Sequence, residues 1–173
     1  GIVLSVDNYV PTSSSDHYDR AEQGVVADYV IMMGYDEHFA GGEAGSVSSI
    51  NYVKNGIAGM LENVPREKLI GGVPFYTRLW TEVGDGTITS KAMGIAEEKR
   101  WVDNNQVELT WQADTAQYYG EVQTSDGAQF LWMEEERSLK EKMNVIRQND
   151  LAGVACWKLG FEDSAAWDSI QWN

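Results

Sequence analysis

The chain has 173 residues, of which 43% are hydrophobic and 11% aromatic, enough for one folded domain with its own core. Its net charge of −14, from 13 basic and 27 acidic residues, repels an extended phosphate backbone, so we expect no nucleic-acid partner. No apolar stretch of the sequence reaches the length of a membrane span. Cys156 is the single cysteine, which excludes a disulfide within the chain and suits a small buried side chain.

The amino-terminal part of the sequence indicates a strand, a helix and a second strand. Residues 2–6, IVLSV, form a continuous run rich in β-branched residues, which is typical of a strand covered on both faces. A polar stretch at 11–16 leads to a short helix that we expect to end near Gly24, and a second apolar run follows at 26–33. Because the first run begins immediately after Gly1, we expect the sequence to start inside a longer protein.

The second apolar run breaks abruptly into polar residues. Tyr35 and Asp36 stand where this strand ends, and His38 follows on the same loop. Parallel α/β sheets place their chemistry at this edge, because side chains there leave the packed interior and face a crevice. Asn8 and Tyr9 hold the equivalent position after the first run. Consecutive polar residues on one loop rarely converge on one ion, so we expect no metal site.

A helix and a third strand are predicted after the Gly-rich loop that follows His38. Apolar residues recur at helical spacing between 50 and 64, with Ser46 or Ser48 as the N-cap and Pro65 at the close. The strand is predicted at 69–75.

The carboxyl-terminal part continues the alternation of strand and helix. A helix over 139–147, with Lys142 on its polar face, precedes a strand at 153–159, and the tail forms a last short helix. This alternation predicts a parallel sheet with right-handed crossovers. The span 81–135 breaks the pattern with a helix at 91–103 and three strand-like segments, which indicates a small α+β insertion.

These elements predict an α/β fold divided into three parts. Residues 1–80 hold three barrel-type strands with their helices, residues 81–135 form the insertion, and residues 136–173 hold the last helix, the last strand and the terminal helix. Without the insertion, about four strand–helix units remain, half of an eight-fold barrel.

Three segments carry a resemblance to a known family: M-G-Y-D at 33–36, G-V-P-F-Y-T-R-L-W at 72–80 and G-V-A-C-W-K-L-G at 153–160. They resemble the last three strands of glycoside hydrolase family 18, the chitinase-like (β/α)8 family that includes bacterial spore and cell-wall glycosylases. The resemblance implies the carboxyl-terminal half of a TIM barrel, strands five to eight, with a small α+β insertion between strands seven and eight.

The resemblance also implies a chemistry that needs no cofactor, in which the 2-acetamido oxygen of the substrate attacks the anomeric carbon. Tyr35 would donate a hydrogen bond to the acetamido carbonyl as charge develops, and Asp36 would orient the sugar. Trp157 would form the apolar floor beneath the cleaved sugar. The other candidate substrate contacts are Met33, Tyr76, Arg78, Trp80, Asn8 and Tyr9. The alternative for each of these residues is packing at the barrel mouth or in a loop.

The sequence departs from the family in its acidic signature. Nothing in it matches D-x-x-D-x-D-x-E, and the nearest acidic string, M-E-E-E-R at 133–137, does not substitute for it. We therefore expect a segment of a glycosidase for N-acetylglucosamine-containing glycans, chitin or peptidoglycan, that is inactive alone. The alternatives are a non-catalytic, lectin-like glycan-binding module and a doubly wound domain without a glycan role.

Half a barrel has two unpaired strand edges and an uncovered apolar face. We therefore expect the chain to form a homodimer or to associate with a separate amino-terminal half-barrel. The acidic charge, the single cysteine and the resemblance indicate an extracellular location or the bacterial cell envelope.

Overall fold

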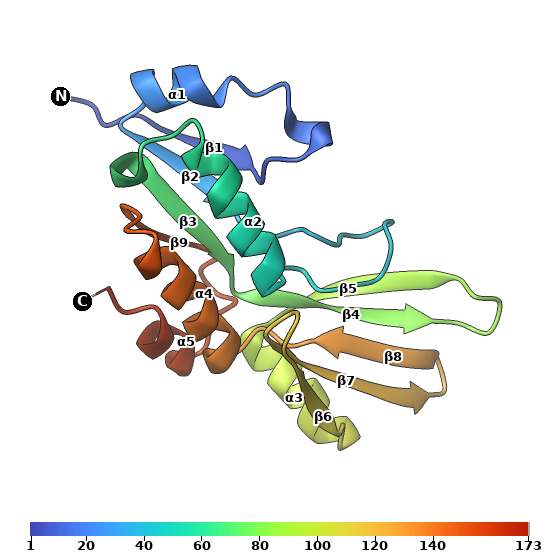
Figure 1. The fold of residues 1–173 in the computed structure, drawn as a ribbon. Coiled ribbons are helices and arrows are strands. Elements are labelled where there is room, and N and C mark those ends of the chain that lie inside the picture. Colours follow the sequence, from blue (N-terminus) through green and yellow to red (C-terminus); the bar gives the residue numbers. More distant parts are fainter. Residues whose placement is uncertain (173) are drawn as a thin grey trace.

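The computed structural model describes residues 1–172 and shows a parallel sheet and an antiparallel sheet side by side (Figure 1). The parallel sheet has the strand order β1-β2-β3-β9. Its strands are β1 Ser5–Tyr9, β2 Tyr29–Met33, β3 Leu69–Pro74 and β9 Gly153–Trp157. All neighbouring strands in it run parallel, which confirms the predicted strand–helix alternation.

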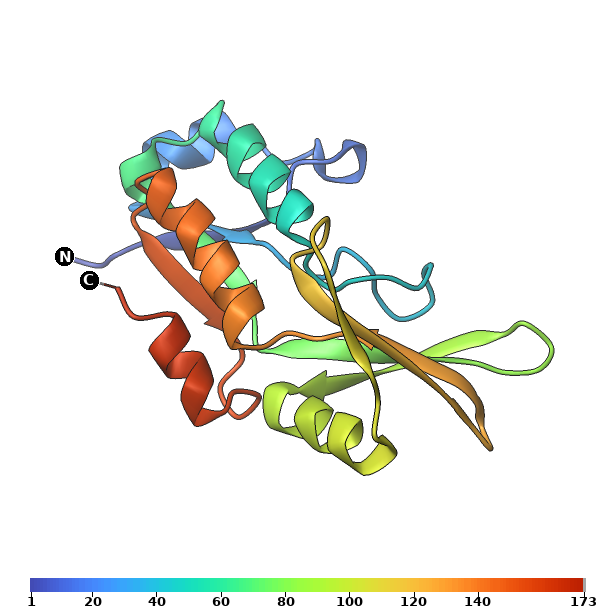
Figure 2. The same ribbon diagram turned by 60° about the horizontal axis from the view of Figure 1, so that its bottom comes forward.

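Helices cover one face of the parallel sheet (Figure 2). They are α1 Arg20–Val26, α2 Ile50–Leu61, α4 Glu136–Gln148 and, beside α4, α5 Ser164–Ser169. Two short 3₁₀ helices lie at Ser13–Ser15 and Arg66–Lys68. Val30, Met32 and Val73 of the sheet form one core with apolar residues of α2 and α4, because side chains alternate between the two faces of a strand. No helix within residues 1–172 is long and apolar enough to cross a membrane.

The opposite face of the parallel sheet remains open, and we call it the open face. Its side chains include Tyr9, Tyr29 and Trp157, which are 51%, 39% and 53% exposed. At its centre, Gly72 pairs in register with Ala155, and Gly153 lies on the same face of β9. Ordinary parallel sheets in α/β proteins are covered on both faces, so this sheet lacks a layer within the described residues.

The first strand differs from the prediction. Ile2, Val3 and Leu4 lie before β1 and are exposed, although the sequence predicts a strand over 2–6 that is buried on both faces. The physical reason is that β2 begins at Tyr29, which pairs with Ser5. The Leu4 carbonyl accepts from the Asp28 and Tyr29 amides, and Ile2 and Val3 have no neighbouring strand to join among the described residues.

The helix after the second strand has a different cap from the expected ones. Ser49 is the N-cap of α2, and its Oγ accepts a hydrogen bond from the Tyr52 amide at 3.1 Å. Ser46 and Ser48 are buried just before it and make hydrogen bonds to other segments of the chain. Their polar groups are therefore used in tertiary contacts and not in capping.

The antiparallel sheet has the strand order β5-β4-β8-β7-β6 and carries α3 on one face (Figure 1). Its elements are β4 Tyr76–Glu82, β5 Ile88–Gly94, α3 Ile95–Asn105, β6 Leu109–Gln112, β7 Gln117–Thr124 and β8 Gly127–Trp132. The sheet begins at Tyr76, before the expected boundary at residue 81, because Tyr76 already pairs with Gly94. Residues 88–94 are a strand, so the helix predicted at 91–103 starts at Ile95.

Lys142 is buried, which corrects its expected place on the polar face of α4. Its ammonium group donates to both carboxylate oxygens of Glu134, at 2.8 and 2.9 Å. The side chains of Lys142 and Glu134 are 1% and 0% exposed, so α4 is joined to the end of β8 by a buried ion pair.

Candidate functional site

The candidate site lies at the carboxyl ends of the parallel strands. Gly34 follows β2, and its amide donates to the carbonyl of Gly72 on β3 at 3.1 Å. A Cβ atom at Gly34 would lie 2.5 Å from that carbonyl oxygen, so only glycine allows this approach. The chain thus stays tied to β3 until it reaches Tyr35.

Tyr35, Asp36 and Tyr76 come together at this edge. The Tyr76 hydroxyl donates to Asp36 Oδ1, and the Tyr35 and Tyr76 rings meet edge to face with centroids 6.3 Å apart. Asp36 has a φ of 59°, a left-handed conformation that is uncommon for residues other than glycine, although Asp adopts it more often than most. The bond from Tyr76 therefore fixes a carboxylate on a backbone that would otherwise adopt other conformations.

Both phenols of this group remain protonated at neutral pH. Burial, aided by the carboxylates of Asp7 and Asp36, raises the pKa of Tyr35 to about 12. Burial and the hydrogen bond to Asp36 raise the pKa of Tyr76 above its ordinary value. The site therefore offers hydroxyl donors next to a carboxylate acceptor.

Trp157 ends β9 at the same edge of the sheet. Its carbonyl accepts a hydrogen bond from the Phe75 amide at 2.7 Å, and the peptide bond to Lys158 is cis. Its side chain is among the exposed aromatic residues, whereas Phe75 is buried. An indole ring is thus available at the sheet edge, as the sequence predicts.

Two of the other predicted substrate contacts, Arg78 and Trp80, lie on β4. Arg78 lies on β4, where Nη1 donates to Ser90 Oγ at 3.2 Å and the buried Nε has no partner among the described residues. Trp80 is 1% exposed, and its indole nitrogen donates to the Gly45 carbonyl at 2.9 Å. Trp80 therefore supports a loop and has no free surface for a ligand.

The candidates on β1 and β2 also differ in position. Asn8 is 0% exposed, and its Nδ2 donates to Gln23 of α1 at 2.8 Å, so it faces the helices and not the site. Both Asn8 and Tyr9 belong to β1 and do not follow it. Met33 pairs with Gly72 and Tyr9 in register, which puts these residues on the open face.

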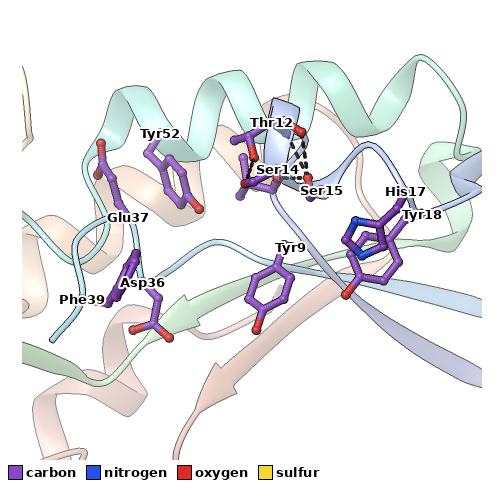
Figure 3. Close-up of a pocket in the computed structure, with 11 residues that line it drawn as sticks. Tyr9, Thr12, Ser14, Ser15, His17, Tyr18, Asp36, Glu37, Phe39 and Tyr52 are labelled. Atoms are coloured by element: carbon purple, nitrogen blue, oxygen red, sulfur yellow. Dashed lines mark hydrogen bonds between the residues drawn. The ribbon is translucent and has the colours of Figure 1, made fainter. Parts of the chain in front are cut away.

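A hollow of about 580 Å³ adjoins Asp36, between the loop after β1 and the loop after β2 (Figure 3). Besides Tyr9, Asp36 and Glu37, its lining includes Ser14, His17, Tyr18, Phe39 and Tyr52. The sequence predicts a site role for none of these last five, because they come from two loops and a helix that only the fold brings together. Burial and the Glu37 carboxylate raise the pKa of Tyr52 to about 12, so it too is a donor.

Glu37 has a structural role at the start of α2. Its carboxylate accepts from the Ser49 amide at 2.7 Å and from the Ser49 hydroxyl at 3.0 Å. His38 Nδ1 lies 2.9 Å from the Glu43 carbonyl. Within residues 1–172, no group of three or more His, Cys, Asp or Glu side chains is arranged to hold a metal ion.

Comparison with solved structures identifies the fold as a TIM-barrel-type α/β fold. A chitinase from Chromobacterium violaceum superposes with a TM-score of 0.90 at 23% identity, over 98% of this chain and 55% of that chain. A putative sporulation-specific glycosylase, YdhD, from Bacillus subtilis superposes with a TM-score of 0.83 at 27% identity, over 92% of this chain and 54% of that one.

Residues 3–162 match the model of glycosyl hydrolases family 18, and the chain belongs to this family. The uncharacterized glycosylase YvbX of Bacillus subtilis is 30% identical over 94% of this chain and 49% of its own length. A cortical fragment-lytic enzyme of Bacillus subtilis is 26% identical over 87% of this chain and 35% of its own length. The chain therefore spans about half the length, or less, of the curated relatives that it matches.

Proposed function

We propose that the chain is strands five to eight of a (β/α)8 glycosidase barrel that cleaves N-acetylglucosamine-containing glycans. The observation that carries this proposal is the Tyr35–Asp36–Tyr76 group at the same sheet edge as the exposed Trp157, in a chain of family 18. The open face and the coverage of about half of YvbX support the half-barrel.

In the proposed reaction the acetamido carbonyl oxygen of the substrate attacks C1 while the glycosidic oxygen leaves with a proton. The Tyr35 hydroxyl donates a hydrogen bond to the acetamido group as charge develops on it, and its raised pKa keeps the proton on the phenol. Asp36, held by Tyr76, accepts from the acetamido N–H or a sugar hydroxyl. Trp157 stacks on the C–H face of the sugar ring.

The proton donor for the leaving oxygen is not supplied by this chain in our proposal. The nearest acidic string holds three glutamates at the start of α4. Glu134 and Glu135 are buried, where Glu134 pairs with Lys142 and Glu135 caps the helix, and Glu136 pairs with Lys99. These carboxylates are therefore held in structural contacts. We therefore propose that the chain is inactive alone and acts when the open face is completed by an amino-terminal half-barrel.

The names of the relatives suggest two candidate substrates, because they include a chitinase and cortical fragment-lytic enzymes. These substrates are chitin and the peptidoglycan of the spore cortex. We propose a cell-envelope or extracellular place of action on the same ground. A non-catalytic, lectin-like role is the second candidate, because Trp157 and the Tyr35 group form a glycan-binding half-site without an acid.

The test is titration of the chain with N-acetylglucosamine trimer, followed by tryptophan fluorescence and calorimetry. We expect saturable binding that Trp157→Ala abolishes and that Trp172→Ala leaves unchanged. Hydrolysis of a chromogenic chitobioside distinguishes the two candidate functions. If the chain is part of a glycosidase, we expect activity only after an amino-terminal half-barrel from a family member is added; if it is lectin-like, we expect none. Absence of trimer binding both alone and in that complex contradicts both candidates.

A further inference from the structure

A buried set of hydrogen bonds crosses from the parallel sheet to the antiparallel sheet. Lys142 of α4 donates to Glu134, and Nε2 of Gln117 on β7 donates to Glu134 Oε2 at 3.0 Å. Ser138 Oγ donates to Glu134 Oε1 at 2.8 Å. Gln117 is 1% exposed, so the whole group is removed from water. Glu134 thereby has a hydrogen-bond donor on each of its oxygens.

The same hydrogen bonds continue into the loop of residues 37–49. Ser46 Oγ donates to Gln117 Oε1 at 2.5 Å, and the Ser48 amide donates to Ser46 Oγ at 3.0 Å. Ser48 Oγ in turn donates to the Gly34 carbonyl at 2.6 Å. This carbonyl belongs to the peptide bond that joins Gly34 to Tyr35. The series therefore ends on the backbone of the proposed acetamido donor.

Gln117 is the residue that joins the two halves of this series. Its amide nitrogen donates to the Glu134 carboxylate while its amide oxygen accepts from the Ser46 hydroxyl. From the Ser48 amide to Gln117, successive donors point toward the Glu134 carboxylate, and hydrogen bonds aligned in this way strengthen one another. The Ser48 hydroxyl donates the other way, to Gly34. A carboxylate at position 117 lacks the donor, and an apolar side chain lacks both groups.

Other contacts tie the end of this loop to β4 and to the turn between β6 and β7. Trp80 donates to the Gly45 carbonyl at 2.9 Å, and the Ile50 amide donates to the Thr115 carbonyl at 2.9 Å. These two bonds hold the loop and the start of α2, whereas the bond from Ser46 to Gln117 leads through Ser48 to Gly34. The side chain of Gln117 is thus connected to the site by defined bonds, although it does not line the site.

We propose that Gln117 is a positioning residue, which fixes the loop of residues 37–49 on the antiparallel sheet and through Ser48 holds the peptide of Tyr35. The assignment rests on the proposed function for its effect on glycan binding. Its effect on the loop does not depend on any ligand. In this proposal the antiparallel sheet positions the site residues without contacting the ligand.

Gln117→Leu tests the proposal, with Gln123→Leu as its matched control, because Gln123 lies on the same strand and is exposed. In Gln117→Leu we expect the Glu37 and Ser49 amides, both hydrogen-bonded in the loop, to exchange hydrogen at least about tenfold faster. We expect the affinity for N-acetylglucosamine trimer to fall about tenfold, as for the loss of a buried hydrogen bond. Gln123→Leu should change neither quantity.

Ser46→Ala breaks the same connection from the loop side and leaves the bond from Gln117 to Glu134 intact. It should reproduce the faster exchange, and the double variant should add little to either single change, since coupled residues are not additive. Unchanged exchange over 37–49 in both variants, or acceleration spread equally over β1, β3 and β9, overturns the proposal. Faster loop exchange in a chain that binds no trimer supports the positioning contact and contradicts the proposed function instead.

Discussion

The Tyr35 hydroxyl is the group whose removal most directly tests the site. Tyr35→Phe keeps the ring that packs against Tyr76 and removes only the donor, so we expect little change in the free energy of unfolding. The affinity for N-acetylglucosamine trimer should fall by about tenfold, equivalent to roughly 1.4 kcal/mol. Calorimetric titration measures the affinity, and urea unfolding measures the stability.

Tyr119→Phe is the matched control for this substitution, because Tyr119 lies on β7 and its hydroxyl bonds only to the neighbouring Glu121 among the contacts of the described residues. It should bind the trimer as well as the unchanged chain. Equal affinity in Tyr35→Phe and Tyr119→Phe would remove Tyr35 from the site.

We expect the burial of Glu98 to make the stability of the fold depend on pH. It is 0% exposed on α3, its Oε2 accepts from the Glu134 amide at 3.2 Å, and its Oε1 has no partner within the described residues. Burial, together with the carboxylates of Glu134 and Glu135, raises its pKa well above the ordinary 4.5, although Lys99 and the backbone bond oppose this. The folded state therefore keeps this proton to a higher pH than the unfolded state does.

The stability that Glu98 contributes is complete below pH 4.5 and is lost as the pH rises from there through the folded pKa. Glu98→Gln cannot titrate, so its unfolding temperature should fall less than that of the unchanged chain as the pH rises above 4.5. Thermal unfolding followed by circular dichroism checks this difference. Parallel pH profiles for the two proteins would contradict the raised pKa.

At the scale of the elements, α4 is held to the antiparallel sheet by the pair of Lys142 and Glu134. Lys142→Met leaves the Glu134 carboxylate buried without its cation, so we expect a loss of about 3–5 kcal/mol in the free energy of unfolding. Lys140→Met, at an exposed position of the same helix, should cost less than about 1 kcal/mol. Urea unfolding compares the two, and similar losses would show that the pair does not stabilise the fold.

The sequence predicts most elements because continuous apolar runs and helical spacing are local signals. The strands at 69–75 and 153–159 and the helix starting at Ile50 agree with β3, β9 and α2 to within a few residues. Lys142 was misplaced because spacing shows which residues share a face, but not that Glu134 lies opposite them. The first strand was misplaced because an apolar run does not show where its neighbour begins.

The site is only partly predictable from the sequence, for a related reason. Tyr35, Asp36 and Trp157 follow apolar runs at strand ends, so the sequence places them at one edge. Asn8 follows the same rule and Trp80 was a candidate through the resemblance, yet both are buried and make tertiary hydrogen bonds to Gln23 and Gly45. The lining of the hollow beside Asp36 comes from separate loops and leaves no local pattern.

At the scale of the whole molecule, the open face and the free edges of β1 and β9 predict association. We expect the chain to sediment as a dimer, or as a complex once an amino-terminal half-barrel is added, since unpaired strand edges bind other strands. Ala155→Arg puts a charge on the open face and should abolish either association. Gln123→Arg, on the antiparallel sheet, should not.

Analytical ultracentrifugation over a range of concentrations distinguishes these outcomes. A compact monomer that binds no half-barrel would show that the open face needs no cover.

The small residues of the open face determine which side chains a covering layer needs. The middle of this face carries only small side chains, from Gly72, Gly153 and Ala155. A Cβ at Gly72 would lie 2.6 Å from the Met32 carbonyl oxygen, so a larger residue does not fit at this position. Packed interiors leave few voids. Strands that complete the sheet must therefore place large apolar side chains opposite these small residues. A specific partner can be distinguished from a nonspecific one by whether it has large side chains at these positions.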